Sequence, residues 1–168
     1  MAYKITEAYI VPQAIADIST TAQVSLGTIV RAKDATYGQG EFIYLLGVAS
    51  TVVGMVVRYN ATTFQTALLT VTNGKNKGVP VAVAMSANVA SSYGWYQISG
   101  NAVVKKTTVA VTPQVPIFIS GTDGRIKVLA SAGQQILGAQ TANLTTIVTT
   151  TSTVVVTINR PSTQGQIT

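Results

Sequence analysis

From Leu26 onward, apolar and polar residues alternate in short segments that are separated by Gly, Asn, Asp, Ser and Pro. A period of two residues is typical of strands with one buried face, and clusters of turn residues mark the connections between them. The strands recur every ~8–12 residues, a spacing typical of sandwiches and barrels. We expect strands at residues 26–33, 41–46, 52–59, 66–72, 79–85, 93–99, 101–106, 115–119, 125–130, 135–141, 145–150 and 153–159.

Two turns can be placed from their residues. Asp123-Gly124 predicts a tight hairpin, because Asp-Gly favours the positive φ values that such turns require. Ser99-Gly100-Asn101 predicts a second turn, between strands 93–99 and 101–106. The last part of the chain is rich in Thr and Val and predicts a hairpin, whose edge needs a cover from a sheet or a partner chain.

The first 24 residues differ from the rest, because they include Pro12 and show no clean alternation. We expect residues 1–24 to form an extended N-terminal arm, residues 25–160 a single all-β domain, and residues 161–168 a polar C-terminal tail. The domain is predicted to be a β-sandwich or a jelly-roll-like barrel. An arm that folds back onto the sheet as an extra strand remains an alternative.

Composition supports the all-β class. The chain has 25 Thr, 23 Val and 14 Ile, and these β-branched residues disfavour helices and suit strands. Only 10% of the residues are charged, against about 25% in typical soluble domains. The formal charge of +6 therefore reflects a shortage of acid, with 11 Lys and Arg against 5 Asp and Glu. Thr, Ser, Gln and Asn must cover most of the surface.

The side chains offer little catalytic chemistry. The chain has no His and no Cys, which removes the commonest metal ligands and the commonest general base. The Gly-rich segments at residues 37–42 and 73–78 match no phosphate-binding pattern. Asp34 and Glu41 flank residues 37–40 and could lie near each other, but solvated loop ends are the simpler interpretation of this pair. We therefore expect no enzymatic activity, no metal and no cofactor.

Membrane and nucleic-acid binding are also not favoured. Residues 42–57 are apolar but number only 16 and include two Gly, so we expect two strands there and not a membrane span, which needs about 20 residues. No signal peptide is expected at the start. Basic residues occur in pairs at Lys75 and Lys77, Lys105 and Lys106, and Arg125 and Lys127. Solvated turn charge is the simpler interpretation, and single-stranded nucleic-acid binding is the less favoured one.

The only Trp of the chain lies in strand 93–99. Side chains of a strand alternate between its two faces, so Trp95 and Tyr96 must point in opposite directions. If the side of Ile98 and Tyr96 faces the core, Trp95 faces a second sheet or a neighbouring chain. Both interpretations of Trp95, a core residue and an interface anchor, remain open at this point.

Residues 94–105, Gly-Trp-Tyr-Gln-Ile-Ser-Gly-Asn-Ala-Val-Val-Lys, resemble a segment of small head proteins of tailed bacteriophages. Residues 79–100, 116–126 and 134–141 are similar to the same proteins in their order of an aromatic strand, an Ala-Val strand, an Asp-Gly turn and a Gly-Ala strand. The family indicated is that of the capsid decoration, or cement, proteins. The resemblance implies a β-rich, oligomeric protein on the outer shell, and it transfers no site residue.

We accordingly expect a structural virion protein that is made in the host cytoplasm and binds the outer surface of the capsid. Its partners would be the major capsid protein and further copies of itself, with a trimer favoured over a dimer. The expected contact residues are Tyr3, Tyr9, Ile10 and Val11 of the arm, together with Trp95. The alternative function is a head-fibre base or a glycan-binding virion module, with Trp95 in a shallow groove.

Overall fold

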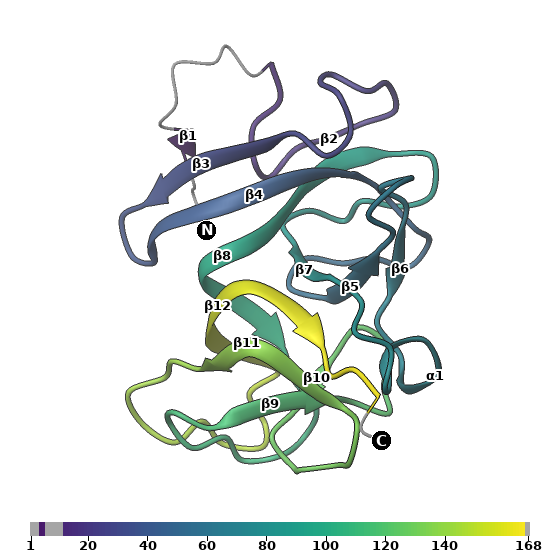
Figure 1. Ribbon diagram of the computed structural model, residues 1–168. Helices are drawn as coiled ribbons and strands as arrows, with labels where there is room; N and C mark the ends of the chain where they lie inside the picture. The colour runs from purple at the N-terminus through teal and green to yellow at the C-terminus, as the bar shows by residue number, and fades with distance from the viewer. Residues whose placement is uncertain (1–3, 6–11, 167–168) are drawn as a thin grey trace.

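The computed structural model describes residues 4–5 and 12–166 of the chain (Figure 1). The all-β class is confirmed, since the described residues form antiparallel strands and a single-turn helix. The elements are β1 (Lys4–Ile5), β2 (Ile18–Ser19), β3 (Ile29–Asp34), β4 (Gly38–Leu46), β5 (Val56–Tyr59), β6 (Thr66–Leu68), α1 (Val71–Gly74), β7 (Val81–Ala84), β8 (Tyr93–Lys105), β9 (Pro116–Ile119), β10 (Ile126–Lys127), β11 (Gln135–Thr141) and β12 (Thr153–Thr163).

The strands form one curled antiparallel sheet, a half-barrel, in the order β1-β3-β4-β8-β12-β11-β9-β10. A smaller group attaches to it through β7, which pairs with both β8 and β5, while β5 also pairs with β6. β8 is the spine of this arrangement, because it pairs with β4 over its first half and with β12 over its second half. Figure 1 shows β8 running from the β3–β4 layer down to the layer of β9, β11 and β12.

The prediction of a turn at residues 99–101 is wrong, because β8 continues through these residues as one strand of 13 residues. Gly100 has a φ of +92° and marks the place where β8 changes partners. Ser99 is opposite Glu41 of β4 and Asn159 of β12 at the same time. A side chain at position 100 would meet the carbonyl oxygen of Gln39. The glycine therefore serves a bend in a continuous strand, which a one-dimensional pattern cannot distinguish from a hairpin turn.

One face of the β4–β8 pair carries an aromatic cluster. Trp95 lies opposite Tyr44 in the ladder, with ring centroids 4.9 Å apart, and both side chains have no exposed surface. Phe42 and Ile15 belong to the same buried cluster. Such tilted aromatic pairs add about 0.5–1.5 kcal/mol to the stabilisation from burial alone.

The cover over this cluster comes from the start of the chain. Gln13 is buried, and its backbone carbonyl accepts a hydrogen bond of 3.1 Å from Trp95 Nε1. The hydroxyl of Tyr44 donates to Gln13 Oε1 over 2.6 Å. The described part of residues 1–24 therefore folds back against the sheet, and β2 pairs with β8. The described residues of this segment thus follow the fold-back alternative and not the separate arm, because the aromatic face of β8 needs a second layer and residues 12–24 help to supply it.

The opposite face of the same strand pair is buried against β5 and β7. Tyr96 and Ile98 of β8 lie there with Ile43 and Leu45 of β4. The hydroxyl of Tyr96 accepts a hydrogen bond of 3.0 Å from Nδ2 of Asn88, which is itself fully buried. Both faces of the strand are therefore core, and the alternation predicted for Trp95 and Tyr96 holds.

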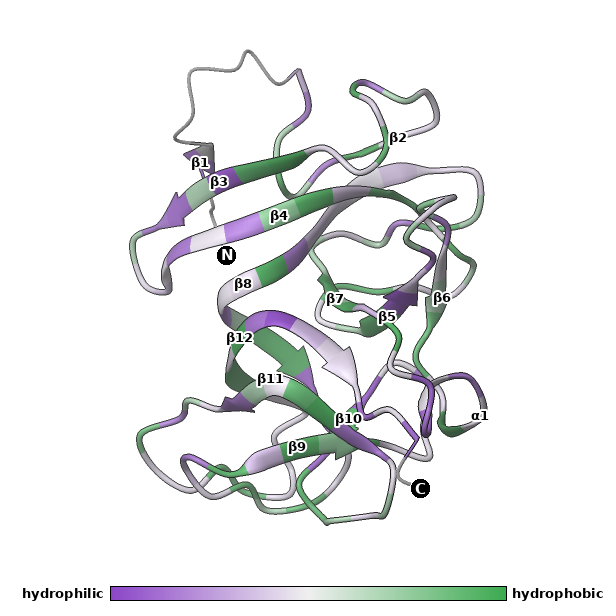
Figure 2. Cartoon of the chain, viewed as in Figure 1, coloured by the Kyte–Doolittle hydropathy of each residue, from purple (hydrophilic) through white to green (hydrophobic). Residues whose placement is uncertain are grey.

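The lower half of the molecule has its own core. It lies between β8, β12, β11 and β9, whose apolar residues are green in Figure 2. Val104 and Ala102 of β8 face Val154 and Val156 of β12 across the ladder. Of the predicted Thr-Val hairpin only the second strand is present, as β12, which pairs with β11 on one side and with β8 on the other, so neither of its edges is open.

Two predicted boundaries are wrong in this half. Residues 145–150 form no strand and contribute only an isolated bridge between Ile147 and Val111. Residues 161–163, expected at the start of a tail, belong to β12. Pro161 is tolerated inside that strand beside Arg160, whose positive φ of 44° marks an irregularity.

Replacement of Gly100 by Ala should lower the free energy of unfolding by about 3 kcal/mol, because a Cβ would be strained at positive φ and would collide with backbone. The measurement is urea unfolding followed by the fluorescence of Trp95. Gly121→Ala is the matched control, since no atom lies within 4 Å of a Cβ at that position. Equal stabilities of the two variants would contradict the account of the bend.

Burial raises the pKa of Tyr96 above its ordinary value, despite hydrogen bonds from Thr66 and Asn88 that oppose the shift. The unfolded tyrosine ionises first, at about pH 10, so its contribution to stability is complete below that pH and is lost as pH rises through the folded pKa. Tyr96→Phe should cost about 1–2 kcal/mol at pH 7, and this difference should shrink at pH 11. Urea unfolding of both proteins at the two pH values tests this, and a pH-independent difference would refute it.

Candidate partner-binding surface

The predicted contact residues divide into two groups. Tyr3, Tyr9, Ile10 and Val11 lie outside the described residues, so their role stays a prediction. Trp95 is fully buried and its indole N–H is bonded within the chain. The prediction of Trp95 as a surface contact is therefore wrong, and its alternative, a core residue, is correct. An exposed aromatic platform at this position is excluded for the same reason.

Two exposed apolar side chains, including the most exposed among the described residues, lie instead on the loop between β11 and β12, residues 142–152. Leu144 is 95% exposed and Val148 is 58% exposed. The other residues of this loop are mainly Thr and Ser, and none is charged. Isolated surface leucines are common, but two large apolar side chains that project from one uncharged loop form a surface suited to a partner.

This loop is held in place by the buried ammonium group of Lys106, the residue that follows β8. Lys106 is 1% exposed, and its Nζ donates to the carbonyl oxygens of Val109 at 2.8 Å, Val148 at 3.1 Å and Thr107 at 3.3 Å. Burial lowers the pKa of Lys106 below that of an ordinary lysine. Hydrogen bonds to a charged donor contribute about 1.5–3 kcal/mol each, so this group joins the loops more firmly than neutral bonds would.

Backbone bonds complete the connection between the loops. Val111 and Ile147 exchange two hydrogen bonds of 2.9 Å. The side chain of Asn143 is buried and donates to the carbonyls of Val111 and Thr145. Leu144 follows Asn143 directly, so the exposed leucine stands on a fixed base. A fixed loop loses little conformational entropy on binding, which favours affinity for a given contact area.

A shallow groove of about 390 Å³ lies where β11 bulges away from β9. Its polar lining consists of neutral side chains, Gln135, Gln140, Thr157 and Asn159. Gly138 takes a positive φ of 67° at this bulge. The groove presents amide donors and acceptors without a charge, which fits a neutral polar ligand.

Within residues 4–5 and 12–166, no group of three or more acidic side chains is arranged to hold a metal ion. No helix in that part of the chain is long and apolar enough to cross a membrane.

No protein-family model matches the chain, and no curated protein matches its sequence.

Sequence reasoning missed Lys106, which it treated as solvated turn charge. The signal was present, because Ala102, Val104 and Lys106 share one face of the strand by alternation. A lysine in register with two core residues needs acceptors for its ammonium group. Those acceptors are backbone carbonyls of loops, and no sequence pattern reveals them.

Lys106→Met should lower the free energy of unfolding by about 2–4 kcal/mol, because it removes three hydrogen bonds from a charged donor and leaves the carbonyl of Val109 without one. It should also make residues 142–152 susceptible to proteolysis under native conditions. Lys105→Met is the matched control, since the neighbouring lysine is half exposed and should change stability by no more than about 0.5 kcal/mol. Urea unfolding and limited proteolysis provide the measurements. Intact loops and unchanged stability in Lys106→Met would contradict the role of the ammonium group.

Proposed function

We propose that this protein decorates the outer surface of a bacteriophage capsid and stabilises contacts between major capsid subunits. The observation that carries the proposal is the pair Leu144 and Val148, exposed on a loop that the buried Lys106 holds rigid. A fixed apolar projection on an uncharged, Thr-rich surface binds another protein by contact area. It offers no means of chemical transformation.

The resemblance of residues 94–105 to phage head proteins supports the same class. These residues lie in β8, so the similar segment belongs to the central strand of the fold and not to the exposed loops. Binding to the assembled lattice alone stabilises that lattice by mass action, by about 2.7 kcal/mol per site when the free concentration is 100 times Kd.

We propose further that the protein acts as a homo-oligomer, with a trimer preferred over a dimer. Symmetric oligomers present the same surface several times, and a lattice with threefold positions allows all copies to bind at once. Linked contacts of this kind raise the overall affinity without any new contact type. Sedimentation velocity of the free protein determines the oligomer number.

The amide-lined groove at the β11 bulge favours a second candidate function, binding of a neutral glycan by a virion module. Gln140, Thr157 and Asn159 offer hydrogen bonds to hydroxyl groups, and Ala139 and Ile158 provide apolar surface beside them. A screen of neutral oligosaccharides by calorimetry tests this candidate. Loss of the heat of binding in Asn159→Ala would support it, and no binding in the screen would remove it.

The decisive experiment for the main proposal is co-sedimentation with mature shells of the phage whose genome encodes the chain, stripped of this protein. At saturation, the number of wild-type copies per shell should be a whole multiple of the number of equivalent lattice positions. Binding should persist in 0.5 M salt. Leu144→Ser should weaken binding about tenfold, because an exposed leucine that becomes buried contributes roughly 1.5–2 kcal/mol.

Val89→Ser is the control, because Val89 is also exposed, at 43%, but lies in the loop before β8 in the other half of the molecule. It should bind as the wild type does. Failure of the wild-type protein to bind any shell would refute the proposed function. Equal weakening by both substitutions would show that the loop of Leu144 is not the contact.

A further inference from the structure

The charges are distributed unevenly along the chain. Four of the five acidic residues lie within the first 41 residues, and Asp123 is the only acid after them. Eight of the 11 basic residues lie after residue 41. Of these eight, Lys106 is internal and Arg160 pairs with Glu41 at 3.1 Å, which leaves six. These are Arg58, Lys75, Lys77, Lys105, Arg125 and Lys127, called the cationic face below.

The fold brings these residues together from separate loops. The turn at residues 122–125 is bonded to the segment before α1, since the amide of Gly124 donates to the carbonyl of Leu69 over 2.9 Å. Asn76, between Lys75 and Lys77, donates its amide to Gly133 over 3.0 Å. Loops 69–78 and 120–134 therefore form one continuous surface.

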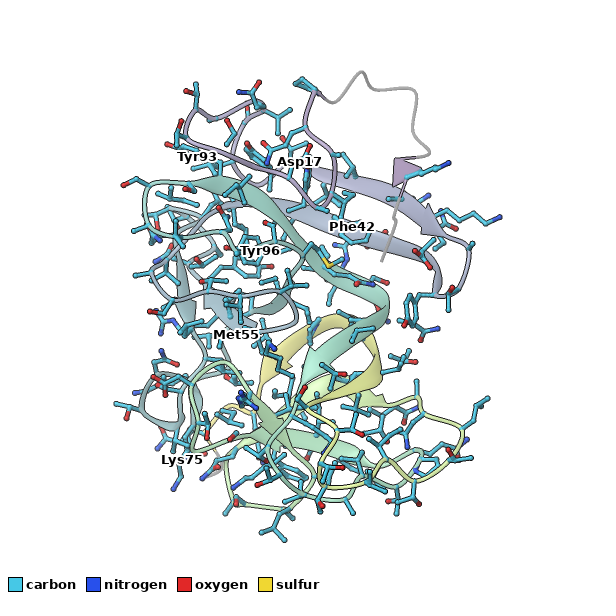
Figure 3. All side chains as sticks on the ribbon, turned by 180° about the vertical axis from the view of Figure 1, so that it is seen from behind. Asp17, Phe42, Met55, Lys75, Tyr93 and Tyr96 are labelled. Carbon is cyan, nitrogen blue, oxygen red and sulfur yellow. The ribbon has the colours of Figure 1, made fainter. Side chains whose placement is uncertain are left out.

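Side-chain bonds place the remaining cations on the same surface. Lys127 Nζ donates to Ser131 Oγ over 2.8 Å, in the loop that contacts Asn76. The guanidinium of Arg125 donates to the carbonyl of Lys106, next to Lys105. The guanidinium of Arg58 donates to the carbonyl of Asn73 in α1. Figure 3 shows Met55, which packs under Gly124, and Lys75 on the same side of the molecule.

Among the described residues, no carboxylate forms an ion pair with a cation of this face. Both ion pairs among the described side chains join Glu41 to an arginine, Arg31 or Arg160. The six cations instead bond to neutral oxygens or extend to solvent. Asp123 is the one acid in these loops, against six cations, so a net positive potential remains to attract an acidic surface.

Exposed apolar residues lie among the cations. Leu129 is 69% exposed and follows Lys127 closely. Val53 is 48% exposed and lies in the turn before β5, whose first residue, Val56, donates its backbone N–H to the carbonyl of Gly124. Every aromatic residue in the described part of the chain is buried or half-buried, so this face offers no ring for a base to stack on. Cations around apolar side chains match a protein surface better than a nucleic-acid strand.

We infer that the cationic face binds an acidic protein surface, one that presents carboxylates around an apolar centre. The inference rests on the proposed function, in which that surface belongs to the capsid subunits beneath the decoration protein. The attraction steers the protein onto the shell at low salt, and the apolar contacts hold it there when salt screens the charges.

The test compares two double variants that remove the same charge. Lys75→Gln/Lys77→Gln alters the cationic face, and Lys4→Gln/Lys33→Gln alters two lysines that pair across β1 and β3 at the opposite end. In co-sedimentation with stripped shells at 50 mM salt, the first variant should bind about tenfold more weakly than the wild type. The second should bind within twofold of it, and the gap should close at 0.5 M salt.

Equal binding of both variants to shells that the wild type saturates would overturn this inference and leave the proposed function intact. If the wild type binds no shell, the proposed function fails, and poly-L-glutamate then serves as the probe. The wild type should bind poly-L-glutamate more tightly than Lys75→Gln/Lys77→Gln does. Equal binding of these two proteins to poly-L-glutamate would overturn the acidic-protein assignment. So would wild-type binding that is tighter to an oligothymidylate than to a poly-L-glutamate with the same number of charges.

Discussion

The structure depends on the burial of one strand, β8, on both of its faces. Trp95 points to one side and Tyr96 to the other, and neither has exposed surface. Two separate layers must therefore cover the strand, and the chain supplies them from opposite directions in sequence. Residues 12–26 cover the tryptophan, and β5–β7 cover the tyrosine. Beyond Gly100 the same strand bends away and pairs with β12, so it also joins the two halves of the molecule.

This constraint determines which residues remain for a partner. The largest aromatic side chains of the described residues are buried in the fold, and the described N-terminal residues cover some of them. What projects from the far end of β8 is a set of loops, and the ammonium of Lys106 connects them by donating to backbone carbonyls from two of them. One buried cation thus supplements the apolar contacts where the loops meet, because backbone carbonyls need a donor and the lysine that follows Val104 on the same face of the strand supplies it.

The sequence predicted the class of the fold and most strands well, because alternation and turn residues act locally. Its errors share a cause in long-range contacts. Gly100 was interpreted as a turn because only its contact with Gln39 distinguishes a bend from a reversal. The N-terminal arm was predicted from poor alternation, yet Gln13 bonds to Tyr44 and Trp95, far away in sequence. The candidate surface was hardest to predict, because Leu144 and Lys106 gain their roles only when the loops meet.

The most direct test of the contact surface is hydrogen exchange of the protein free and bound to stripped shells, read peptide by peptide. The account predicts that binding slows exchange in residues 122–134 and 142–152, the loops that carry the cationic face and Leu144. Exchange at the outer strand β3 should stay unchanged. Protection confined to β3 and the N-terminal segment, with the loops still exchanging as in the free protein, would contradict the account.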